Sequence, residues 1–270
     1  QVIWLCTALW VASVGFYFAG FELFPYLLQR LGPVALLLWS PVFALVAVVA
    51  YSALSIAIAV AGKWAVLGKC RAGMVPVGSL QFLRHWLAQQ FVRLVPWGLL
   101  QGTELQCVVL RWLGARIGKR VHLHRGVDLQ QGGWDLLQIG DDVAIGQDAT
   151  LLLTALLDGH LVLGPVTIGN GSTIEVRACV SGGASLGERA HLAPSAWLST
   201  GAHVGDGESW NGIPATKVGA SPPIAEPVRG RELSVREHGV CTFVLRSLLS
   251  LLLTAPPAVA LAVVFSAFGV

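Results

Sequence analysis

The chain has 270 residues, of which 54% are hydrophobic and only 12% are charged. Soluble domains carry about 25% charged residues, so this composition argues against a wholly water-soluble protein. The formal net charge is +3, and the basic residues flank apolar runs without interleaved exposed aromatic residues, which gives no reason to expect nucleic acid as a partner.

Three apolar runs are long enough to cross a bilayer, which takes about 20 residues. They are Val2 to Phe21, Val34 to Gly62 and Val240 to Val270. We therefore expect two transmembrane helices in residues 1–62 and a third transmembrane segment in residues 240–270. Because the chain begins and ends inside apolar runs, we also expect it to be a piece of a longer multi-pass membrane protein.

Most of the charge lies between the second and third runs. By the positive-inside rule, this middle part of an integral membrane protein faces the cytoplasm or an equivalent reducing compartment. The five cysteines form no CxxC pair and no metal-ligand spacing, which is consistent with reduced thiols. The basic residues beside the runs are Lys63, Lys69, Arg71, Arg84, Arg93, Arg229, Arg231, Arg236 and Arg246.

Residues 63–112 are expected to form amphipathic helices on the membrane surface. From Leu80 to Leu94, apolar residues recur at helical spacing, with polar residues such as His85 between them. The alternative is a soluble helix that caps the end of the next domain. Tryptophans with arginine nearby suit the headgroup zone of a bilayer, and here they are Trp86, Trp97 and Trp112.

A six-residue repeat dominates the next part of the chain. It is typical of the left-handed parallel β-helix, in which three short strands make a turn of about eighteen residues and small residues allow the tight corners. We expect this all-β domain in residues 113–219, inserted between transmembrane helices and followed by a linker in residues 220–239. The regular inward positions are Ile168, Ile174, Val180, Leu186, Leu192, Leu198 and Val204.

Two interruptions break the repeat, at Gln130–Trp134 and at Thr154–Gly164. Loops that leave a solenoid commonly carry its function, and the second interruption contains His160. A neutral imidazole can take a proton from an attacking amine or hydroxyl, so His160 is a candidate general base, with Asp158 as the group that orients it. The alternative is that His160 is an ordinary polar loop residue.

The stretch Trp210-Asn-Gly-Ile-Pro-Ala-Thr-Lys217 follows the repeat. It resembles the exit sequence of hexapeptide acyltransferases, in which the backbone and a basic residue lie near the pantetheine arm of coenzyme A. The resemblance implies that Trp210, Gly212, Pro214 and Lys217 bind that arm. The alternative is a turn that Gly212 and Pro214 impose as the chain leaves the β-helix.

Gln147-Asp-Ala-Thr150 resembles a stretch of the γ-class carbonic anhydrases, which share this fold. Their three zinc histidines would fall on Leu153, Val176 and Ser181 of this chain. None of these side chains supplies an imidazole, so no metal site is predicted.

The order of the parts resembles one module of the membrane-embedded C-terminal region of ε-poly-L-lysine-synthetase-type nonribosomal peptide synthetases. The resemblance implies a module that joins amino acids held as phosphopantetheine thioesters, within a tandem of like modules. The stretches that carry it are Phe82–Gln89, Leu113–His122, Asp135–Asp141, Leu163–Gly169 and Glu208–Ala215.

We therefore expect a membrane-bound acyl- or aminoacyltransferase that passes an acyl group from a phosphopantetheine or coenzyme A thioester to an amine. The alternative is a non-catalytic structural subunit of a larger membrane protein complex, with the β-helix as a rigid soluble knob. The expected partners are membrane lipid and either two further copies in a homotrimer or neighbouring like modules, because active sites in this fold usually lie between subunits.

Overall fold

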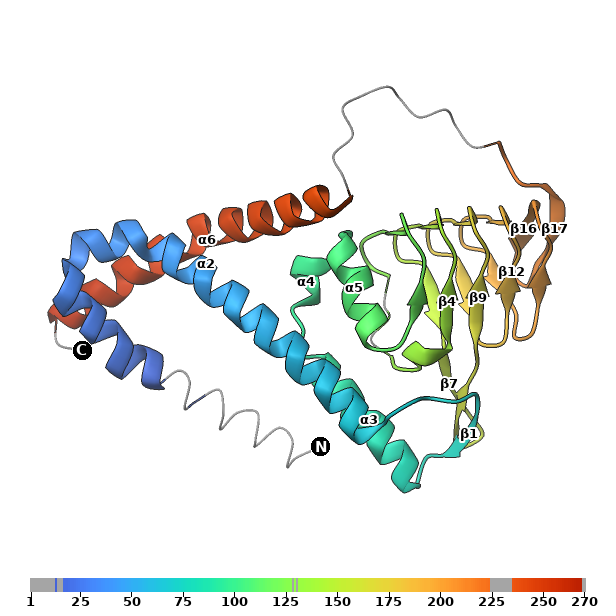
Figure 1. Cartoon of the computed structure of the whole chain (residues 1–270), viewed down its shortest axis with the longest axis horizontal. Coiled ribbons are helices and arrows are strands. Elements are labelled where there is room, and N and C mark those ends of the chain that lie inside the picture. The colour runs from blue at the N-terminus through green and yellow to red at the C-terminus, as the bar shows by residue number, and fades with distance from the viewer. Residues whose placement is uncertain (1–12, 14–16, 128, 130, 224–234, 269–270) are drawn as a thin grey trace. The chain divides into compact units, whose positions relative to one another are not determined.

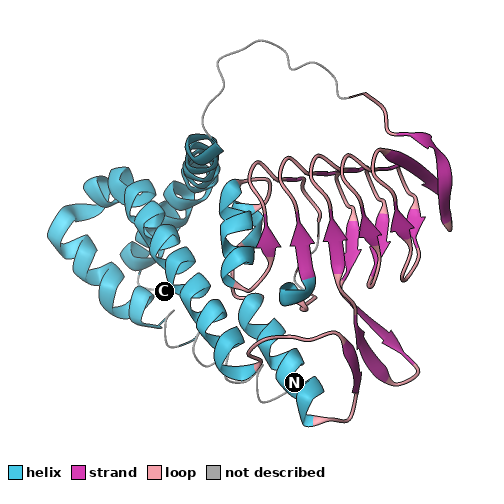
Figure 2. Cartoon of the chain, turned by 45° about the vertical axis from the view of Figure 1, so that its right-hand side comes forward, coloured by secondary structure: helices cyan, strands magenta, loops and turns pink. Residues whose placement is uncertain are grey.

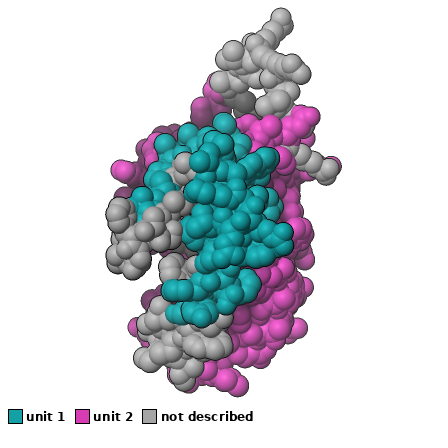
Figure 3. Space-filling view, turned by 90° about the vertical axis from the view of Figure 1, so that its left-hand side faces the viewer, with its two compact units in different colours: residues 1–50, 245–270 teal, residues 51–244 magenta. Residues whose placement is uncertain are grey.

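The computed structural model describes residues 13, 17–127, 129, 131–223 and 235–268. These residues divide into two compact units (Figure 3). The first comprises residues 1–50 and 245–270, and the second comprises residues 51–244. The second unit contains the β-helix and every candidate site residue.

Long helices make up the first unit and continue into the second. A π-helical segment, η1 (Phe18–Leu23), leads into α2 (Phe24–Val66), which has a non-helical residue at Gly32. Within the described residues, only the stretch Leu38–Val66 of α2 is long and apolar enough to cross a membrane. The helix α6 (Val235–Phe268) covers the third apolar run, whereas most of the first run lies outside the described residues.

Three parallel sheets form the faces of a β-helix in the second unit (Figure 1). In the regular part of the coil, strands on the same face of successive turns pair at a spacing of eighteen residues, as Thr173 does with His191 and Cys179 with Trp197. The parallel β-helix predicted from the six-residue repeat is therefore confirmed.

The first face contains β2 (Arg116–Ile117), β4 (Leu137–Ile139), β9 (Val166–Ile168), β12 (Ser185–Leu186) and β15 (His203–Val204). The second contains β3 (His122–Leu123), β5 (Ala144–Ile145), β10 (Thr173–Ile174), β13 (His191–Leu192) and β16 (Glu208–Gly212), and β17 (Ala215–Ala220) pairs with β16 antiparallel. The third contains β6 (Thr150–Leu152), β11 (Cys179–Ser181) and β14 (Trp197–Leu198).

The aliphatic residues of the repeat fill the interior of the coil. Ile174, Val180 and Leu198 have no exposed surface, and each such side chain contributes about 1.5–3 kcal/mol through burial. The small residues lie at the corners, where Ala178 is completely buried. The residue before it, Arg177, has a φ of 57°, so the corner includes a left-handed backbone conformation.

The second interruption of the repeat is a β-hairpin where a loop was expected. Strand β7 (Thr154–Leu157) pairs antiparallel with β8 (His160–Leu163), and β1 (Gly73–Pro76) joins β8 as a third strand. Figure 2 shows these three strands apart from the ladder of the coil. Asp158 and Gly159 both have positive φ, which matches a two-residue hairpin turn.

Three helices precede the coil: α3 (Leu80–Val92), α4 (Trp97–Leu100) and α5 (Glu104–Trp112). The Leu110 side chain of α5 is fully buried in the same cluster as the first coil residues, so α5 caps the coil. The expectation that Trp97 lies in a headgroup zone is wrong, because Trp97 is buried and donates its Nε1 proton to a main-chain oxygen of α3. Trp112, in contrast, is exposed.

A buried ion pair ties the end of α2 to the residue that directly follows the first interruption of the repeat. Lys63 Nζ lies 2.9 Å from Asp135 Oδ2, and the two side chains are 0% and 4% exposed. The amide of Cys70 donates a further hydrogen bond to the same oxygen (2.9 Å). These contacts fix the segment between α2 and β1, which forms one wall of the site described next.

Candidate functional site

His160 lies at the start of β8, directly after the hairpin turn, and its side chain is exposed. Its neighbour Leu161 is 6% exposed, because successive side chains of a strand point to opposite faces. The imidazole of His160 therefore points away from the buried face of the hairpin. A base in this position would act on a group that approaches from outside the hairpin.

Asp158 occupies the turn and contacts His160 through its backbone. His160 Nδ1 lies 2.9 Å from the main-chain oxygen of Asp158. A carbonyl oxygen only accepts, so this contact places a proton on Nδ1 and leaves Nε2 as the basic nitrogen. The contact of Asp158 with the ring is thus made by its main-chain carbonyl group.

The four predicted binding residues of the coil exit lie on the hairpin of β16 and β17. Gly212, with a φ of 103°, ends β16, and Pro214 lies in the connection between β16 and β17. Trp210 and Lys217 converge on Glu208, with Lys217 Nζ at 2.6 Å and Trp210 Nε1 at 2.9 Å from its oxygens. These contacts, led by the hydrogen bond from Lys217, lower the pKa of Glu208 to about 2.

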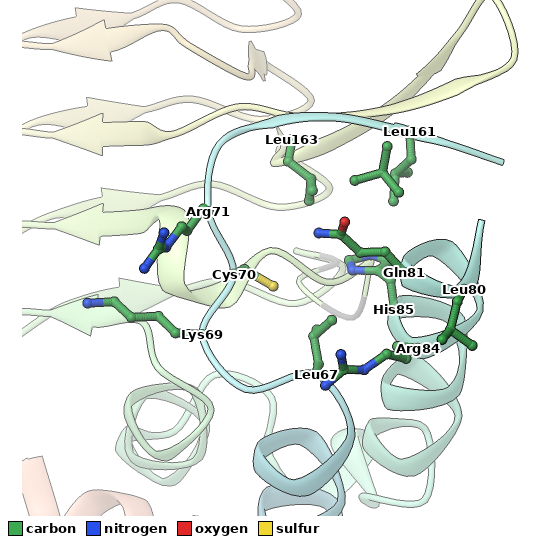
Figure 4. Close-up of a pocket in the computed structure, with 11 residues that line it drawn as sticks. Leu67, Lys69, Cys70, Arg71, Leu80, Gln81, Arg84, His85, Leu161 and Leu163 are labelled. Atoms are coloured by element: carbon green, nitrogen blue, oxygen red, sulfur yellow. The ribbon is translucent and has the colours of Figure 1, made fainter.

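A cavity of about 360 Å³ lies between the buried face of the hairpin and helix α3 (Figure 4). Leu161 and Leu163 of β8 form one side of it, and Leu80 of α3 forms part of another. The segment after α2 closes the third side with its fixed residue Cys70. The cavity thus brings β8 together with two segments that precede it by about eighty residues or more in the sequence.

The polar groups of this cavity are mostly basic or neutral. No Asp or Glu lines it among the described residues, whereas Lys69, Arg71 and Arg84 do. In Figure 4, Arg84 and Gln81 extend toward the cavity, and Lys69 and Arg71 extend away from it. Arg84 and Gln81, both exposed, therefore present one guanidinium and one amide to the cavity.

His85 is the titratable group of the cavity that is buried most deeply, at 4% exposure. Burial lowers the pKa of its imidazole, and a hydrogen bond to the main-chain oxygen of Gln131 opposes that shift only in part. His85 is consequently neutral at pH 7. Gly132 packs against its ring so closely that a Cβ on this glycine would come within 2.5 Å of it.

The Cys70 thiol also lines the cavity but is unsuited to be a nucleophile. Burial raises its pKa to about 11, and the nearby Asp135 carboxylate adds to the shift. A thiol with this pKa stays protonated at neutral pH, and the thiolate is the reactive form. Within the described residues, no group of three His, Cys, Asp or Glu is placed to hold a metal ion.

The sequence patterns predict His160 as the candidate base, and they indicate only that His85 is a polar residue of an amphipathic helix. The available signal was the stretch Phe82–Gln89, which carries the family resemblance and has His85 at its centre. An amphipathic pattern does not distinguish a polar residue that faces solvent from one that faces a cavity, and for that reason His85 was missed.

No protein-family model matches the chain. The chain is similar to the δ-poly-L-ornithine synthetase of Acinetobacter baumannii (strain AB307-0294), with 33% identity over 148 residues. The match covers 55% of this chain and 11% of that protein, so the chain spans only about a tenth of the relative's length. This similarity agrees with the resemblance that the sequence motifs indicate.

Hexapeptide-repeat acetyltransferases are among the similar solved structures. A maltose O-acetyltransferase from Clostridium difficile 630 is 14% identical, with 60% of this chain and 98% of that chain covered and a TM-score of 0.40. A hexapeptide-repeat acetyltransferase from Vibrio cholerae O1 biovar eltor, complexed with acetyl coenzyme A, is 20% identical, with 41% and 62% covered and a TM-score of 0.35. The likeness concerns the hexapeptide-repeat fold alone.

Proposed function

We propose that this chain is an acyl- or aminoacyltransferase module that forms an amide from a pantetheine thioester and an amine. The observation that carries the proposal is the 33% identity over 148 residues to a protein named δ-poly-L-ornithine synthetase. A poly-amino-acid synthetase must form amide bonds repeatedly. The acyl group and the acceptor would then both be amino acids, with ornithine as the first candidate.

The thioester arm, from a carrier or from coenzyme A, would bind at the coil exit. Trp210, Gly212 and Pro214 would line the arm, and Lys217 would exchange its Glu208 partner for a phosphate. A groove of about 530 Å³ adjoins this hairpin and contains Arg189, a second cation suited to a phosphate. When bound, the thioester supplies an activated acyl carbon.

Two imidazoles are candidates for the proton transfer. His160 is exposed at the hairpin and was predicted from the sequence, together with Asp158. His85 is buried beside the cavity and is neutral at pH 7, which is the form that a general base requires. Both belong to the second unit, on opposite faces of β8.

The module would be part of a multi-pass integral membrane protein with its β-helix on the cytoplasmic side. The 29-residue apolar stretch Leu38–Val66 of α2 supports one span. The further partners would be membrane lipid and either like modules in tandem or two more copies in a homotrimer, within a larger membrane complex.

The test is a transfer assay with the full chain in detergent or lipid discs. Ornithinyl-pantetheine is the donor, L-ornithine is the acceptor, and the product is detected by mass spectrometry. We expect the wild type to form an ornithine dipeptide. Loss of the dipeptide in His160→Ala assigns His160 as the base, and its loss in His85→Gln assigns His85. If no thioester is consumed with any amine, and the chain co-purifies in fixed stoichiometry with a membrane assembly, it is a structural subunit.

A further inference from the structure

The cavity beside His85 combines an apolar wall with several polar side chains. Its apolar side consists of Leu161 and Leu163, which are 6% and 7% exposed and therefore held in place by the hairpin. Its other side carries Gln81 and Arg84 on one turn of α3 (Figure 4). Ligand sites commonly pair an apolar wall with a few converging polar groups.

Arg84 has donors to spare for a ligand. Its Nε donates to the main-chain oxygen of Val66 (2.5 Å), which fixes the plane of the guanidinium. Both terminal nitrogens then remain for a carboxylate or phosphate, which a guanidinium binds in a bidentate manner. Among the described residues, no carboxylate lines the cavity, and no ion pair of Arg84 is found.

His85 presents an unused acceptor at the same place. Its Nε2 lies 3.4 Å from the main-chain oxygen of Gln131 and 3.5 Å from the side-chain nitrogen of Gln89, which donates to that same oxygen. We assign the proton to Nε2, because a carbonyl oxygen only accepts and the Gln89 amide is already bound to it. The other nitrogen, Nδ1, is buried and has no hydrogen-bond partner. A buried polar atom without a partner costs about 1–3 kcal/mol, and a ligand N–H beside the cavity would remove that cost.

The volume selects the size of the ligand. At about 360 Å³ the cavity is at the small end of ligand sites, which span about 300–1,000 Å³. It suits a small acid better than a coenzyme that includes a nucleotide. Arg84 is exposed and His85 is buried, so a molecule with a carboxylate and an amine could place the first on Arg84 and the second on His85.

We propose that this cavity binds the acceptor of the transfer reaction, a free amino acid, with its carboxylate on Arg84 and its reacting amine on His85. The role of this ligand as the acceptor rests on the proposed function, whereas its binding in the cavity does not. Gln81 supplies an amide beside the carboxylate, and the leucines of β8 cover the carbon chain.

The transfer step is balanced by one proton relay. The nitrogen of the neutral acceptor amine attacks the thioester carbonyl carbon, so that a C–N bond forms and the C–S bond breaks. His85 Nδ1 takes the proton from the amine nitrogen and passes it to the departing sulfur. The products are an amide and a free thiol, and no oxidant or reductant is required.

Binding to the full chain in detergent tests the proposal, with L-ornithine as the probe and calorimetry as the measurement. We expect 1,4-diaminobutane, which lacks the carboxylate, to bind at least about tenfold more weakly. Arg84→Gln should weaken ornithine binding by a similar factor, Arg84→Lys by less, and Arg125→Gln, an exposed arginine of the coil, not at all. Coenzyme A should not compete with ornithine.

Equal affinity for the diamine and the amino acid, or displacement of ornithine by coenzyme A, would overturn the assignment. Unchanged ornithine binding in Arg84→Gln, at an unchanged melting temperature, would do the same. In the transfer assay, kcat/KM of the wild type should rise with pH as His85 loses its proton, and His85→Gln should form no dipeptide. Ornithine binding without any turnover would contradict the proposed function and support this binding site. Turnover without ornithine binding in this cavity would support the proposed function and contradict the binding site.

Discussion

Removing one partner of the ion pair between Lys63 and Asp135 should strongly lower the free energy of unfolding of the second unit. Replacing Lys63 with Met leaves a carboxylate that is only 4% exposed without its cation. Removing one partner of a buried pair costs about 3–5 kcal/mol. The hydrogen bond from the Cys70 amide remains and places the expected loss toward the lower end of that range.

The double variant separates the charge from the packing. Lys63→Met with Asp135→Leu removes both charges, and such replacements of buried pairs are often neutral or stabilising. The double variant should therefore lose much less stability than the sum of the losses in Lys63→Met and Asp135→Leu. The free energy of unfolding is measured by denaturant titration of the full chain in detergent, followed by tryptophan fluorescence.

The exposed pair of Arg120 and Asp142 provides a matched control. Asp142→Asn removes the same charge from side chains that are 59% and 51% exposed, and solvent screening makes such pairs weak. Asp135→Asn should be strongly destabilising and Asp142→Asn almost silent. Equal effects of the two substitutions, or a loss under about 1 kcal/mol in Lys63→Met, would refute the reasoning.

Three further predictions concern the cavity and the coil. Because burial lowers the pKa of His85, the unfolded chain binds more protons than the folded chain below pH 6.5, and the free energy of unfolding should fall as the pH is lowered from 6.5. His85→Gln should make this pH dependence weaker in denaturant titrations at several pH values. The Cys70 thiol, with a pKa of about 11, should resist iodoacetamide at pH 8 while the exposed Cys241 is labelled, as mass spectrometry of peptides will show. Gly164→Ala would place a Cβ 2.7 Å from the backbone of the next turn of the coil and should destabilise the fold by about 1–3 kcal/mol in thermal unfolding. As a control, Gly219→Ala meets nothing within 4 Å and should leave the melting temperature unchanged.

The β-helix could be predicted because its physical requirements repeat in the sequence. Each turn needs an aliphatic residue inside and a small residue at the corner, and residues such as Val180 and Ala178 meet those needs at fixed intervals. The interruption at 154–164 was predicted for the same reason, since the period fails there.

The site could not be predicted in the same way because it depends on pairing between distant segments. Strand β1 joins the hairpin across more than eighty residues, with Pro76 opposite His160, and no local pattern encodes that partner. The burial of His85 and of Trp97 follows from the same tertiary packing. A helical pattern gives the helix, but not which of its polar residues faces a cavity.

The most direct test of the central claim is to measure both products of a single reaction mixture. The full chain is incubated with ornithinyl-pantetheine and L-ornithine, the free thiol is titrated, and the amide is counted by mass spectrometry. The proposal predicts equal amounts of thiol and dipeptide, at a rate that depends on enzyme concentration. Thiol release without dipeptide, equal to that in a sample without enzyme, would contradict the assignment of this chain as an amide-forming transferase.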